Sequence, residues 1–474
     1  MAVALNIPEP RSETDIVDEL VRRARAAMQE FSAADQGRTD EAVTALAWSL
    51  YNPAHARELA ELAVADTGLG NVPDKIVKKQ RKTFGTLRDL LRVKSVGVIE
   101  EDPARGIVKY AKPVGVVAAV TPSTNPGATP ANKAMMALKG RNAIIIAASP
   151  AGLRTTARTV ELMRAELKKI GAPEDLVQML PPPASKEMTQ ALMAAADLVV
   201  ATGSQDNVRR AYSSGTPAIG VGTGNVPVII DETADLDDAA RKISESKCFD
   251  NATSCSSENS VVIVEQVYEE AIAALERAGG YLASASERQQ IERALWPDGK
   301  LNRNLIARDA DVFARGCGLP PEAERMRFFM VEETGVGRGH PFSGEKLSLV
   351  LALYRARDFD DAIARVHAIL AHQGRGHSCG LHTKEMGRAR RLAESTEVVR
   401  VLINQAHTFG NGGSFDNGLP FTLSMGCGTW GGNSIAENLS WRHFINVTHL
   451  VTTIPEDRPG EDELFGPYLQ RYGR

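Results

Sequence analysis

The middle of the chain alternates short, continuous apolar runs with helical segments, and this alternation limits the fold more than any other feature. Five such runs lie between residues 105 and 230: Val114–Val120, Ala143–Ala147, Leu176–Leu180, Leu198–Thr202 and Val226–Ile230. Strands that are apolar at every position are buried on both faces, so these runs predict a parallel sheet with helices on each side. We expect a doubly wound α/β sheet that binds its ligand at the carboxyl ends of its strands.

A second α/β series follows and predicts a second domain. Its expected strands are Val261–Val264, Val350–Tyr354, Gly380–His382 and Val399–Ile403. Two further strand-like segments, Gly106–Lys112 and Phe444–Thr452, belong to neither series. A chain of 474 residues is long enough for two cores. The predicted fold is therefore two doubly wound α/β domains with a cleft between them, plus a β arm.

The first hundred residues show helical periodicity. One helix is expected to start at a cap formed by Thr14-Asp15, and others are expected at about 39–51, 54–67 and 73–92. The run from Lys78 to Lys82 falls within the last of these, where we expect a solvated helix face. The tail Glu456–Arg474 shows no obvious apolar-faced helix.

Composition argues against several classes of protein. The content of 43% hydrophobic and 24% charged residues is that of an ordinary globular protein. A net charge of −4 gives no reason to expect a nucleic acid or membrane partner. Neither a signal peptide nor a membrane span of about 20 apolar residues is apparent, so we expect a cytoplasmic location. The spacing of the five cysteines suggests neither a disulfide framework nor a metal site.

Cys255 is the strongest candidate for a catalytic residue. It lies in the polar loop Phe249–Ser260, directly before the strand expected at Val261. A free cysteine is ordinarily a small buried hydrophobe. Here, however, the small polar neighbours can lower the pKa of the thiol, and the thiolate is the nucleophilic form. The other cysteines lack this setting and are interpreted as structural: Cys248, Cys317, Cys379 and Cys427.

The stretch from Phe249 to Glu265 resembles the nucleophile loop of the CoA-acylating aldehyde dehydrogenases. The resemblance spans about residues 100–450, in the family's order, through Thr121–Pro126, Ala201–Ser204, Tyr212–Gly220, Gly376-His377 and Gly426–Ser434. These motifs are highly specific together, although each is weak alone. The resemblance implies an aldehyde dehydrogenase-like fold, a thioester on Cys255, NADP or NAD as cofactor, and coenzyme A as co-substrate.

Two further catalytic roles follow from this resemblance. Asn125 matches the asparagine whose side-chain amide donates to the oxyanion, together with the backbone N–H of Cys255. Loss of such a donor typically costs about 2.7–4 kcal/mol of transition-state stabilisation. The alternative for Asn125 is an ordinary Asn-Pro turn. His377 matches a histidine typical of the acylating group, which would polarise the CoA thiol or orient the acyl group; a structural histidine is the alternative.

The resemblance also implies the cofactor contacts. Gly203-Ser204 matches the phosphate contact, where a strand ends and a helix begins. Glu345 matches the glutamate that hydrogen-bonds the nicotinamide ribose, although alone it would pass for a surface carboxylate. The other implied contacts are Thr121, Pro122, Ser149, Pro150 and Gly222. Arg154, near the expected adenosine ribose, would favour a 2′-phosphate or is simply a solvated helix residue.

One position departs from the hydrolytic aldehyde dehydrogenases, which carry a glutamate that activates water against the thioester. Counting back from Pro227, the equivalent position is Val221, and neither neighbour is acidic. Without that base, the acyl-enzyme should persist until the CoA thiol attacks it. The expected kinetic order is therefore ping-pong.

The family resemblance divides the chain further. It implies a cofactor-binding domain at 1–100 and 115–234, a catalytic domain at 235–435, and an oligomerisation arm at 101–114 and 436–460, hence a homodimer or homotetramer. The segments Leu62–Gly70, Lys82–Asp89 and Ser204–Arg210 are most similar to the acylating sulfoacetaldehyde dehydrogenases. That likeness implies oxidation of sulfoacetaldehyde to sulfoacetyl-CoA with NADP. Arg375 is a candidate partner for the sulfonate, with a solvated loop arginine as the alternative.

Four other functions remain to be weighed. A hydrolytic aldehyde dehydrogenase would share the thiol but needs the missing glutamate. An acylating enzyme for acetaldehyde or propionaldehyde would share the whole mechanism. A reductase of an acyl phosphate would not be expected to combine Asn125, Glu345 and the Cys255 loop. A protein that only binds or scaffolds would have an inert Cys255 and no cofactor.

Overall fold

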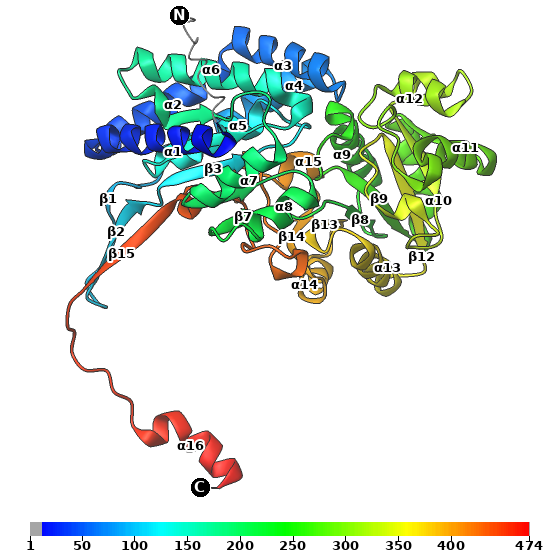
Figure 1. Ribbon diagram of the computed structural model, residues 1–474. Coiled ribbons are helices and arrows are strands. Elements are labelled where there is room, and N and C mark those ends of the chain that lie inside the picture. Colours follow the sequence, from blue (N-terminus) through cyan, green and yellow to red (C-terminus); the bar gives the residue numbers. More distant parts are fainter. Residues whose placement is uncertain (1–11, 474) are drawn as a thin grey trace, which may run out of the picture.

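The computed structural model describes residues 12–473 and contains three sheets (Figure 1). The first is a five-stranded parallel sheet in the order β5-β4-β3-β6-β7, and the second is a seven-stranded parallel sheet in the order β10-β11-β12-β9-β8-β13-β14. The third is a three-stranded antiparallel sheet in the order β1-β2-β15. The prediction of two doubly wound α/β domains with a separate β arm is confirmed.

The first sheet consists of β3 (Val116–Val120), β4 (Ala143–Ala147), β5 (Val177–Met179), β6 (Leu198–Ala201) and β7 (Ala218–Gly220). Its connecting helices are α5 (Ala128–Lys139), α6 (Leu153–Lys169), α7 (Lys186–Ala195) and α8 (Gln205–Tyr212). The strands β3, β4 and β6 are buried at every position, as their apolar runs predict.

Four N-terminal helices pack around this sheet: α1 (Glu13–Glu30), α2 (Gln36–Tyr51), α3 (Pro53–Thr67) and α4 (Val72–Leu91). Helix α1 packs on β4 beside α7, whereas α2 packs on α4, α5 and α6. The cap of α1 is Ser12, which forms a capping box with Asp15, so the helix begins earlier than the predicted Thr14-Asp15 cap.

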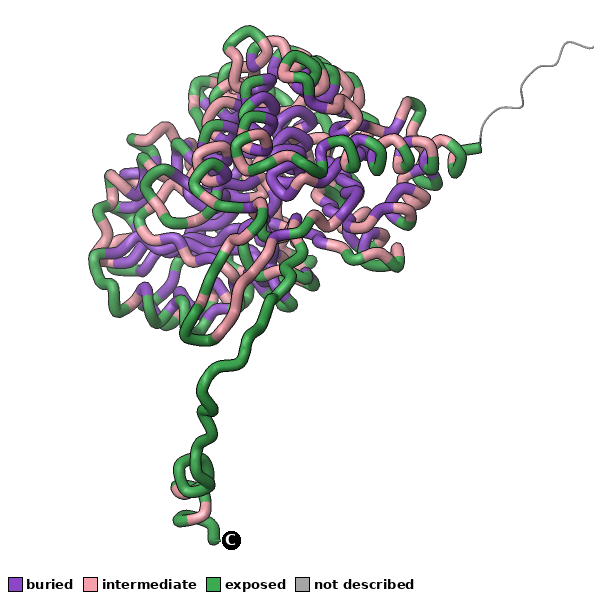
Figure 2. The backbone as a smooth tube through the Cα atoms, turned by 90° about the vertical axis from the view of Figure 1, so that its left-hand side faces the viewer, coloured by how far each residue is buried: buried purple, intermediate pink, exposed green. Residues whose placement is uncertain are grey.

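The second sheet consists of β8 (Val226–Ile230), β9 (Glu258–Val264), β10 (Gly280–Leu282), β11 (Phe328–Glu332), β12 (Val350–Ala356), β13 (Gly376–His382) and β14 (Val398–Ile403). Its helices are α9 (Leu236–Cys248), α10 (Tyr268–Arg277), α11 (Ala285–Leu295), α12 (Ala310–Cys317), α13 (Phe359–His372), α14 (Met386–Ser395) and α15 (His407–Gly410). Figure 2 shows a buried interior in both domains.

Two expectations about these sheets need correction. The apolar pattern predicts that β8 belongs to the first sheet, but it pairs with β9 and β13 in the second. Strands β10 and β11 were not expected at all. The chain therefore leaves the first sheet after β7, and the change of sheet falls at residues 221–225.

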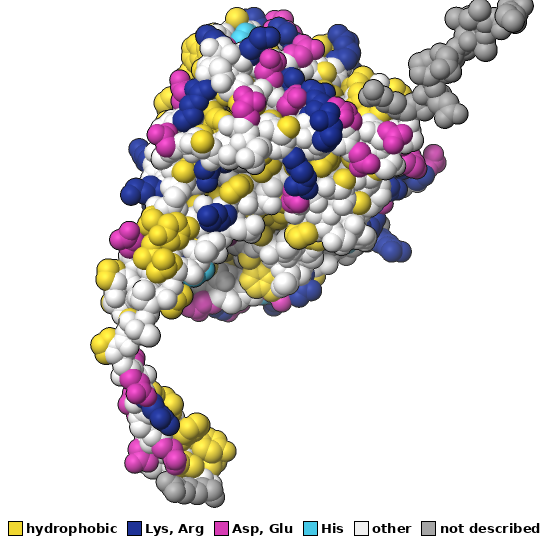
Figure 3. All heavy atoms as spheres, turned by 60° about the vertical axis from the view of Figure 1, so that its left-hand side comes forward, with side chains coloured by type: hydrophobic (Ala, Val, Ile, Leu, Met, Phe, Trp, Pro, Cys, Tyr) yellow, Lys and Arg dark blue, Asp and Glu magenta, His cyan; other side chains and the backbone are white. Residues whose placement is uncertain are grey.

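The arm consists of β1 (Gly97–Asp102), β2 (Ile107–Pro113) and β15 (Ile445–Val451), with Val447 opposite Ala111. An extended segment then leads to α16 (Glu461–Tyr472), which lies away from the body of the protein (Figure 1). Apolar side chains gather on β15 and on α16 (Figure 3), among them Leu464, Phe465 and Tyr468. The expectation that the tail forms no apolar-faced helix is wrong; Gly466 and Pro467 obscure the helical pattern.

No helix within residues 12–473 is both long enough and apolar enough to cross a membrane.

Candidate active site

Two sheet edges face each other across the site. Residues 221–225 run directly from the carboxyl end of β7 to the amino end of β8. Because each sheet is parallel, this short connection places the carboxyl edge of the first sheet opposite the amino edge of the second. A connection of this length spans at most about 18 Å. Side chains from these two edges can therefore meet in one cleft.

The carboxyl edge of the first sheet carries the predicted cofactor contacts. The chain runs outward from β3 through β4 to β5 and then continues from β6 to β7 on the other side, so the switch point lies between β3 and β6. Thr121, Pro122 and Asn125 follow β3, and Gly203 follows β6. A Cβ on Gly203 would lie only 3.7 Å from Pro122 Cα, so these two loops are adjacent. Dinucleotides bind at such a point in doubly wound sheets.

The local geometry fits a nicotinamide cofactor. Gly203 has a φ of 143°, which favours glycine, and leaves the backbone open beside the amino end of α8. Ser204 caps α8 by accepting a hydrogen bond from the N–H of Asn207 at 3.3 Å. Ser149-Pro150 follow β4, the neighbouring strand. A helix amino end beside a glycine is a suitable place for a pyrophosphate.

The amino edge of the second sheet carries the chemical groups. Glu345 precedes β12, Cys255 precedes β9, Gly222 precedes β8, and His377 is the second residue of β13. These four strands are neighbours in the order β12-β9-β8-β13. A Cβ on Gly224 would lie 2.6 Å from Cys255 Cβ, so the connection between the sheets passes directly against the nucleophile loop.

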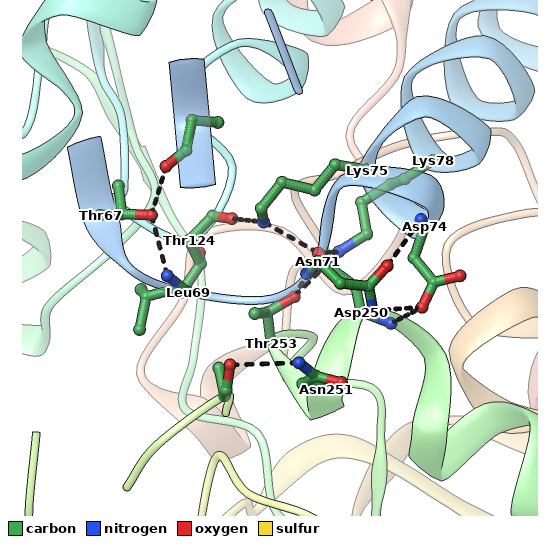
Figure 4. Close-up of polar contacts among 12 residues, drawn as sticks. Thr67, Leu69, Asn71, Asp74, Lys75, Lys78, Thr124, Asp250, Asn251 and Thr253 are labelled. Carbon is green, nitrogen blue, oxygen red and sulfur yellow. Dashed lines mark hydrogen bonds and ion pairs between the residues drawn. The ribbon is translucent and has the colours of Figure 1, made fainter. Parts of the chain in front are cut away.

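The nucleophile loop is fixed to helix α4 by buried ion pairs (Figure 4). Asp250 Oδ2 accepts hydrogen bonds from Lys75 Nζ at 3.0 Å and Lys78 Nζ at 2.5 Å. Thr253 Oγ1 also donates to this carboxylate, at 2.7 Å. Asp250, Asn251 and Ala252 have φ values of 50°, 52° and 60°, which L-residues rarely adopt. The ion pairs hold this strained turn, which presents Cys255.

The thiol of Cys255 is harder to ionise than its polar neighbours suggested. Burial raises its pKa to about 12, with Glu345 and Cys427 adding to the effect and Arg400 opposing it. The expectation of a lowered pKa is therefore wrong for the protein without its substrates. At neutral pH the thiol is protonated, so another group or a bound cation must favour the thiolate.

Alkylation tests this pKa. Below a pKa of about 12, the thiolate fraction of Cys255 rises about tenfold per pH unit. Because the thiolate is the reactive form, the alkylation rate should rise with it. We expect the rate at which iodoacetamide modifies Cys255 to rise from pH 7 to pH 10 without levelling off. Subtracting the rate for Cys255→Ala removes modification at other cysteines. Levelling off below pH 9 would show that the thiol is not perturbed upward.

Glu345 is not an ordinary surface carboxylate. Burial raises its pKa to about 8, while Lys346 and Lys247 oppose the shift. Its backbone N–H donates to Gln373 Oε1 at 3.0 Å. The negative charge of Glu345 also raises the pKa of the Cys255 thiol. A largely protonated carboxyl at neutral pH avoids placing a second negative charge beside the nucleophile.

His377 is buried and neutral. Burial lowers its pKa well below the usual value, and Arg400 and His407 lower it further. Its Nδ1 is 2.8 Å from Ser378 Oγ, whereas its Nε2 is buried without a hydrogen-bond partner among the described residues. An unpaired buried nitrogen is uncommon and is available to a substrate atom.

Arg400 is a site residue that sequence reasoning missed. Its guanidinium is buried and donates to the carbonyl oxygens of His377 and Gly426, each at 2.9 Å, and to Asn438 Oδ1 at 3.0 Å. Its charge lowers the pKa of the Cys255 thiol. Only its position within an otherwise apolar strand could have marked it in the sequence.

The structure does not bring every predicted residue into the cleft. The guanidinium of Arg375 is half-exposed and pairs with Glu397, beside helix α13. The side chain of Arg154 is exposed and pairs with Asp66 at 3.3 Å. Gly222 does lie at the site, where an added Cβ would come within 2.7 Å of Cys427 Sγ.

The lysines of α4 contradict the expectation of a solvated face. Four lysines of this helix are buried: Lys75, Lys78, Lys79 and Lys82. The last three lie three, four and seven residues after Lys75, so all four lie on one side of the helix. This side faces the nucleophile loop and the segment after β3, because Lys75 Nζ also donates to Thr124 O at 3.4 Å.

Comparison with known proteins places these features in a family. The sequence pattern of the aldehyde dehydrogenase family matches residues 7–286. A sulfoacetaldehyde dehydrogenase (acylating) of Cupriavidus necator is 53% identical over 99% of this chain and 96% of its own length. A second, from Bilophila wadsworthia, is 44% identical over 96% of this chain and 98% of its own.

Solved structures agree with this similarity. An acetylating aldehyde dehydrogenase from Geobacillus thermoglucosidasius has a TM-score of 0.90 and 32% identity, over 94% of this chain and 98% of its own. A propionaldehyde dehydrogenase from Rhodopseudomonas palustris, solved with bound CoA and an acylated cysteine, has a TM-score of 0.82 and 25% identity over 92% and 97%. An engineered glycolyl-CoA reductase with bound NADP⁺ has the same TM-score and 26% identity over 92% and 96%.

Proposed function

This chain belongs to the aldehyde dehydrogenase family, and from that membership we propose that it oxidises sulfoacetaldehyde to sulfoacetyl-CoA through a thioester on Cys255. It is an NAD(P)-dependent, CoA-acylating aldehyde dehydrogenase.

The observation that carries the acylating mechanism is the sequence Val221-Gly-Thr-Gly-Asn225 in the connection between the sheets. This connection passes against the nucleophile loop, and Val221 itself is buried. Residues 221–225 contain no carboxylate that could activate water against the thioester. The thioester therefore remains until the sulfur of CoA attacks its carbonyl carbon and releases the thiol of Cys255.

Each step assigns a role to a residue of this chain. The sulfur of Cys255 attacks the aldehyde carbon, and the oxyanion is held by the side-chain amide of Asn125 and the backbone N–H of Cys255. A nicotinamide cofactor held by Gly203, Ser204 and Glu345 would supply the acceptor for the hydride that leaves this carbon. His377, whose Nε2 is unpaired, then polarises the incoming CoA thiol or orients the acyl group.

The cofactor is assigned to the carboxyl edge of the first sheet. We assign its pyrophosphate to Gly203 and Ser204, and its nicotinamide ribose to Glu345, across the cleft. The other proposed contacts are Thr121, Pro122, Ser149, Pro150 and Gly222. The domain division follows the same logic, with 1–100 and 115–234 for cofactor binding and 235–435 for catalysis, except that β8 is counted with the catalytic sheet.

The arm is proposed to join subunits into a homodimer or homotetramer. Within residues 12–473, β15 pairs with β2 on one side only, and Val447, Leu450 and Val451 on this strand are exposed. An exposed apolar edge strand is well suited to pair with or pack against another subunit.

Initial rates over an aldehyde panel test the proposed substrate. We expect kcat/KM for sulfoacetaldehyde to exceed that for propionaldehyde by at least about 10³-fold, because polar recognition discriminates by up to about 10⁴–10⁵-fold, whereas a methylene difference gives about 10–200-fold. Each rate is measured with and without CoA and with NADP⁺ and NAD⁺ separately. Equal or greater efficiency with acetaldehyde or propionaldehyde would favour a neutral substrate and leave the acylating mechanism in place.

A further inference from the structure

Helix α4 carries more buried positive charge than its surroundings neutralise. Lys75 and Lys78 share one buried carboxylate, Asp250. Lys79 and Lys82 lie on the same side of the helix, and neither forms an ion pair with a carboxylate among the described residues. Lysines are seldom buried unless they are paired. Lys79 and Lys82 are therefore without a carboxylate partner in the part of the chain that the structure describes.

Lys79 is the less satisfied of the two. It is 3% exposed, and within residues 12–473 its Nζ has no hydrogen-bond or ion-pair partner. Burial lowers its pKa to about 7, with Lys75 and Lys78 lowering it and Asp250 opposing them. A buried lysine whose ammonium has no protein acceptor is unfavourable, and an anion bound beside it would supply one.

The space beside Lys79 leads to the oxyanion residue. A small cavity of about 10 Å³ is lined by Lys75, Lys78 and Lys79 on one side and by Asn125–Ala128 on the other. A Cβ on Gly127 would lie 3.3 Å from Lys79 Cε, so the lysine stem packs directly on this segment. The cavity holds about one water molecule as it stands. A larger group would displace that water and the flexible lysine ends.

Two further features favour an anion here. Helix α5 begins at Ala128, and its N-cap, Gly127, has no side chain to cap the first-turn N–H groups. The N–H of Thr129 already donates to Asn125 O at 3.2 Å, and Pro130 has no N–H, so the attraction for negative charge here comes mainly from the helix dipole. Lys82 Nζ lies further along α4, donates to Gly412 O at 2.7 Å, and interacts electrostatically with Cys255. Positive groups thus extend from the cavity towards the thiol.

We propose that Lys79, assisted by Lys82 and the amino end of α5, binds the anionic substituent of the aldehyde substrate. This inference rests on the proposed function and specifies its recognition site. Asn125 lines the cavity and is also the proposed oxyanion donor, so the substrate's anion lies close to its carbonyl. The structure therefore favours a short aldehyde with a strongly acidic group on the neighbouring carbon, such as a sulfonate, and selects against an apolar chain.

This assignment replaces Arg375, the candidate from sequence. Arg375 is half-exposed and already paired with Glu397, whereas Lys79 is buried, unpaired and beside Asn125. A desolvated cation discriminates between anionic and neutral ligands far more strongly than a solvated one.

The test compares Lys79→Met with the parent enzyme on two substrates. For sulfoacetaldehyde, kcat/KM should fall at least about 10-fold, the value of a hydrogen bond to a charged group. For propionaldehyde it should stay within about 3-fold, because the thiol and Asn125 are untouched. Lys82→Met should show a smaller loss in the same direction. Lys168→Met, an exposed lysine on α6, is the matched control and should retain both values.

A second measurement separates this inference from the choice of substrate. Ethanesulfonate, which carries the anion but no aldehyde, should inhibit propionaldehyde oxidation competitively, and Lys79→Met should raise its inhibition constant at least about 10-fold. If sulfoacetaldehyde is not preferred but this inhibition behaves as stated, the proposed substrate is wrong and the anion site stands. Equal losses on both aldehydes, or an unchanged inhibition constant in Lys79→Met, would overturn the site. Loss of discrimination in Arg375→Ala, but not in Lys79→Met, would overturn it in favour of Arg375.

Discussion

Replacing Cys255 with alanine is expected to lower the steady-state rate of reduced-cofactor formation by more than about 10⁴-fold, because a nucleophile acts as one unit with its neighbours and its loss removes the covalent route altogether. Hydride transfer requires the carbon–sulfur adduct, so the oxidative half-reaction should fail as completely as acyl transfer. Cofactor binding should remain near normal, since the predicted contacts lie mainly on the first sheet. Absorbance of the reduced nicotinamide and a separate cofactor titration measure the two effects.

Cys248→Ala is the matched control for this variant. Cys248 ends helix α9, close to Cys255 in the chain, and its sulfur contacts Arg327 O at 3.5 Å. We expect it to keep its activity. Appreciable turnover by Cys255→Ala, or a comparable loss in Cys248→Ala, would show that the nucleophile has been assigned to the wrong cysteine.

Omitting CoA is expected to stop turnover after about one equivalent of reduced cofactor per active site. The thioester on Cys255 has no base at residues 221–225 to activate water, so it can be released only by an added thiol. Rapid mixing of enzyme, aldehyde and oxidised cofactor should show a single burst followed by near silence. Later addition of CoA should restore turnover.

The competing outcome is sustained formation of free acid without CoA, which would contradict the missing-base argument. Val221→Glu provides the complementary variant, since it restores a carboxylate at the position counted back from Pro227. We expect it to allow some CoA-independent release, and an unaltered burst in this variant would mean that its carboxylate does not position a water molecule against the thioester.

The strands that are apolar at every position could be predicted closely from sequence. Ala143–Ala147 and Val226–Ile230 have the bounds that their apolar runs indicate. Strands β10 and β11 escaped prediction because β10 spans only Gly280–Leu282, and the run containing β11 had no clear alternation with helices. The sheet to which β8 belongs could not be read from the sequence, since pairing depends on contacts between distant segments.

The candidate site was predicted in part. The motif resemblance indicated Cys255, Asn125, Glu345 and His377, and the structure places the segments that carry them at two facing sheet edges. The raised pKa of the Cys255 thiol was missed because sequence shows neighbours but not desolvation. The lysines of α4 were misjudged for a related reason. A charged stripe on a helix is ordinarily solvated, and only tertiary packing shows that this one is buried.

Because one edge of β15 is open, the stability of this protein is expected to depend on its concentration. A strand edge with unpaired amide groups and exposed apolar side chains gains free energy when a second strand or surface covers it. If another copy supplies that cover, association follows mass action, so the covered fraction rises with protein concentration. The stability of a single chain in dilute solution and that of the protein at the concentrations of a cell are then different quantities, and neither has a meaning unless the concentration is stated with it.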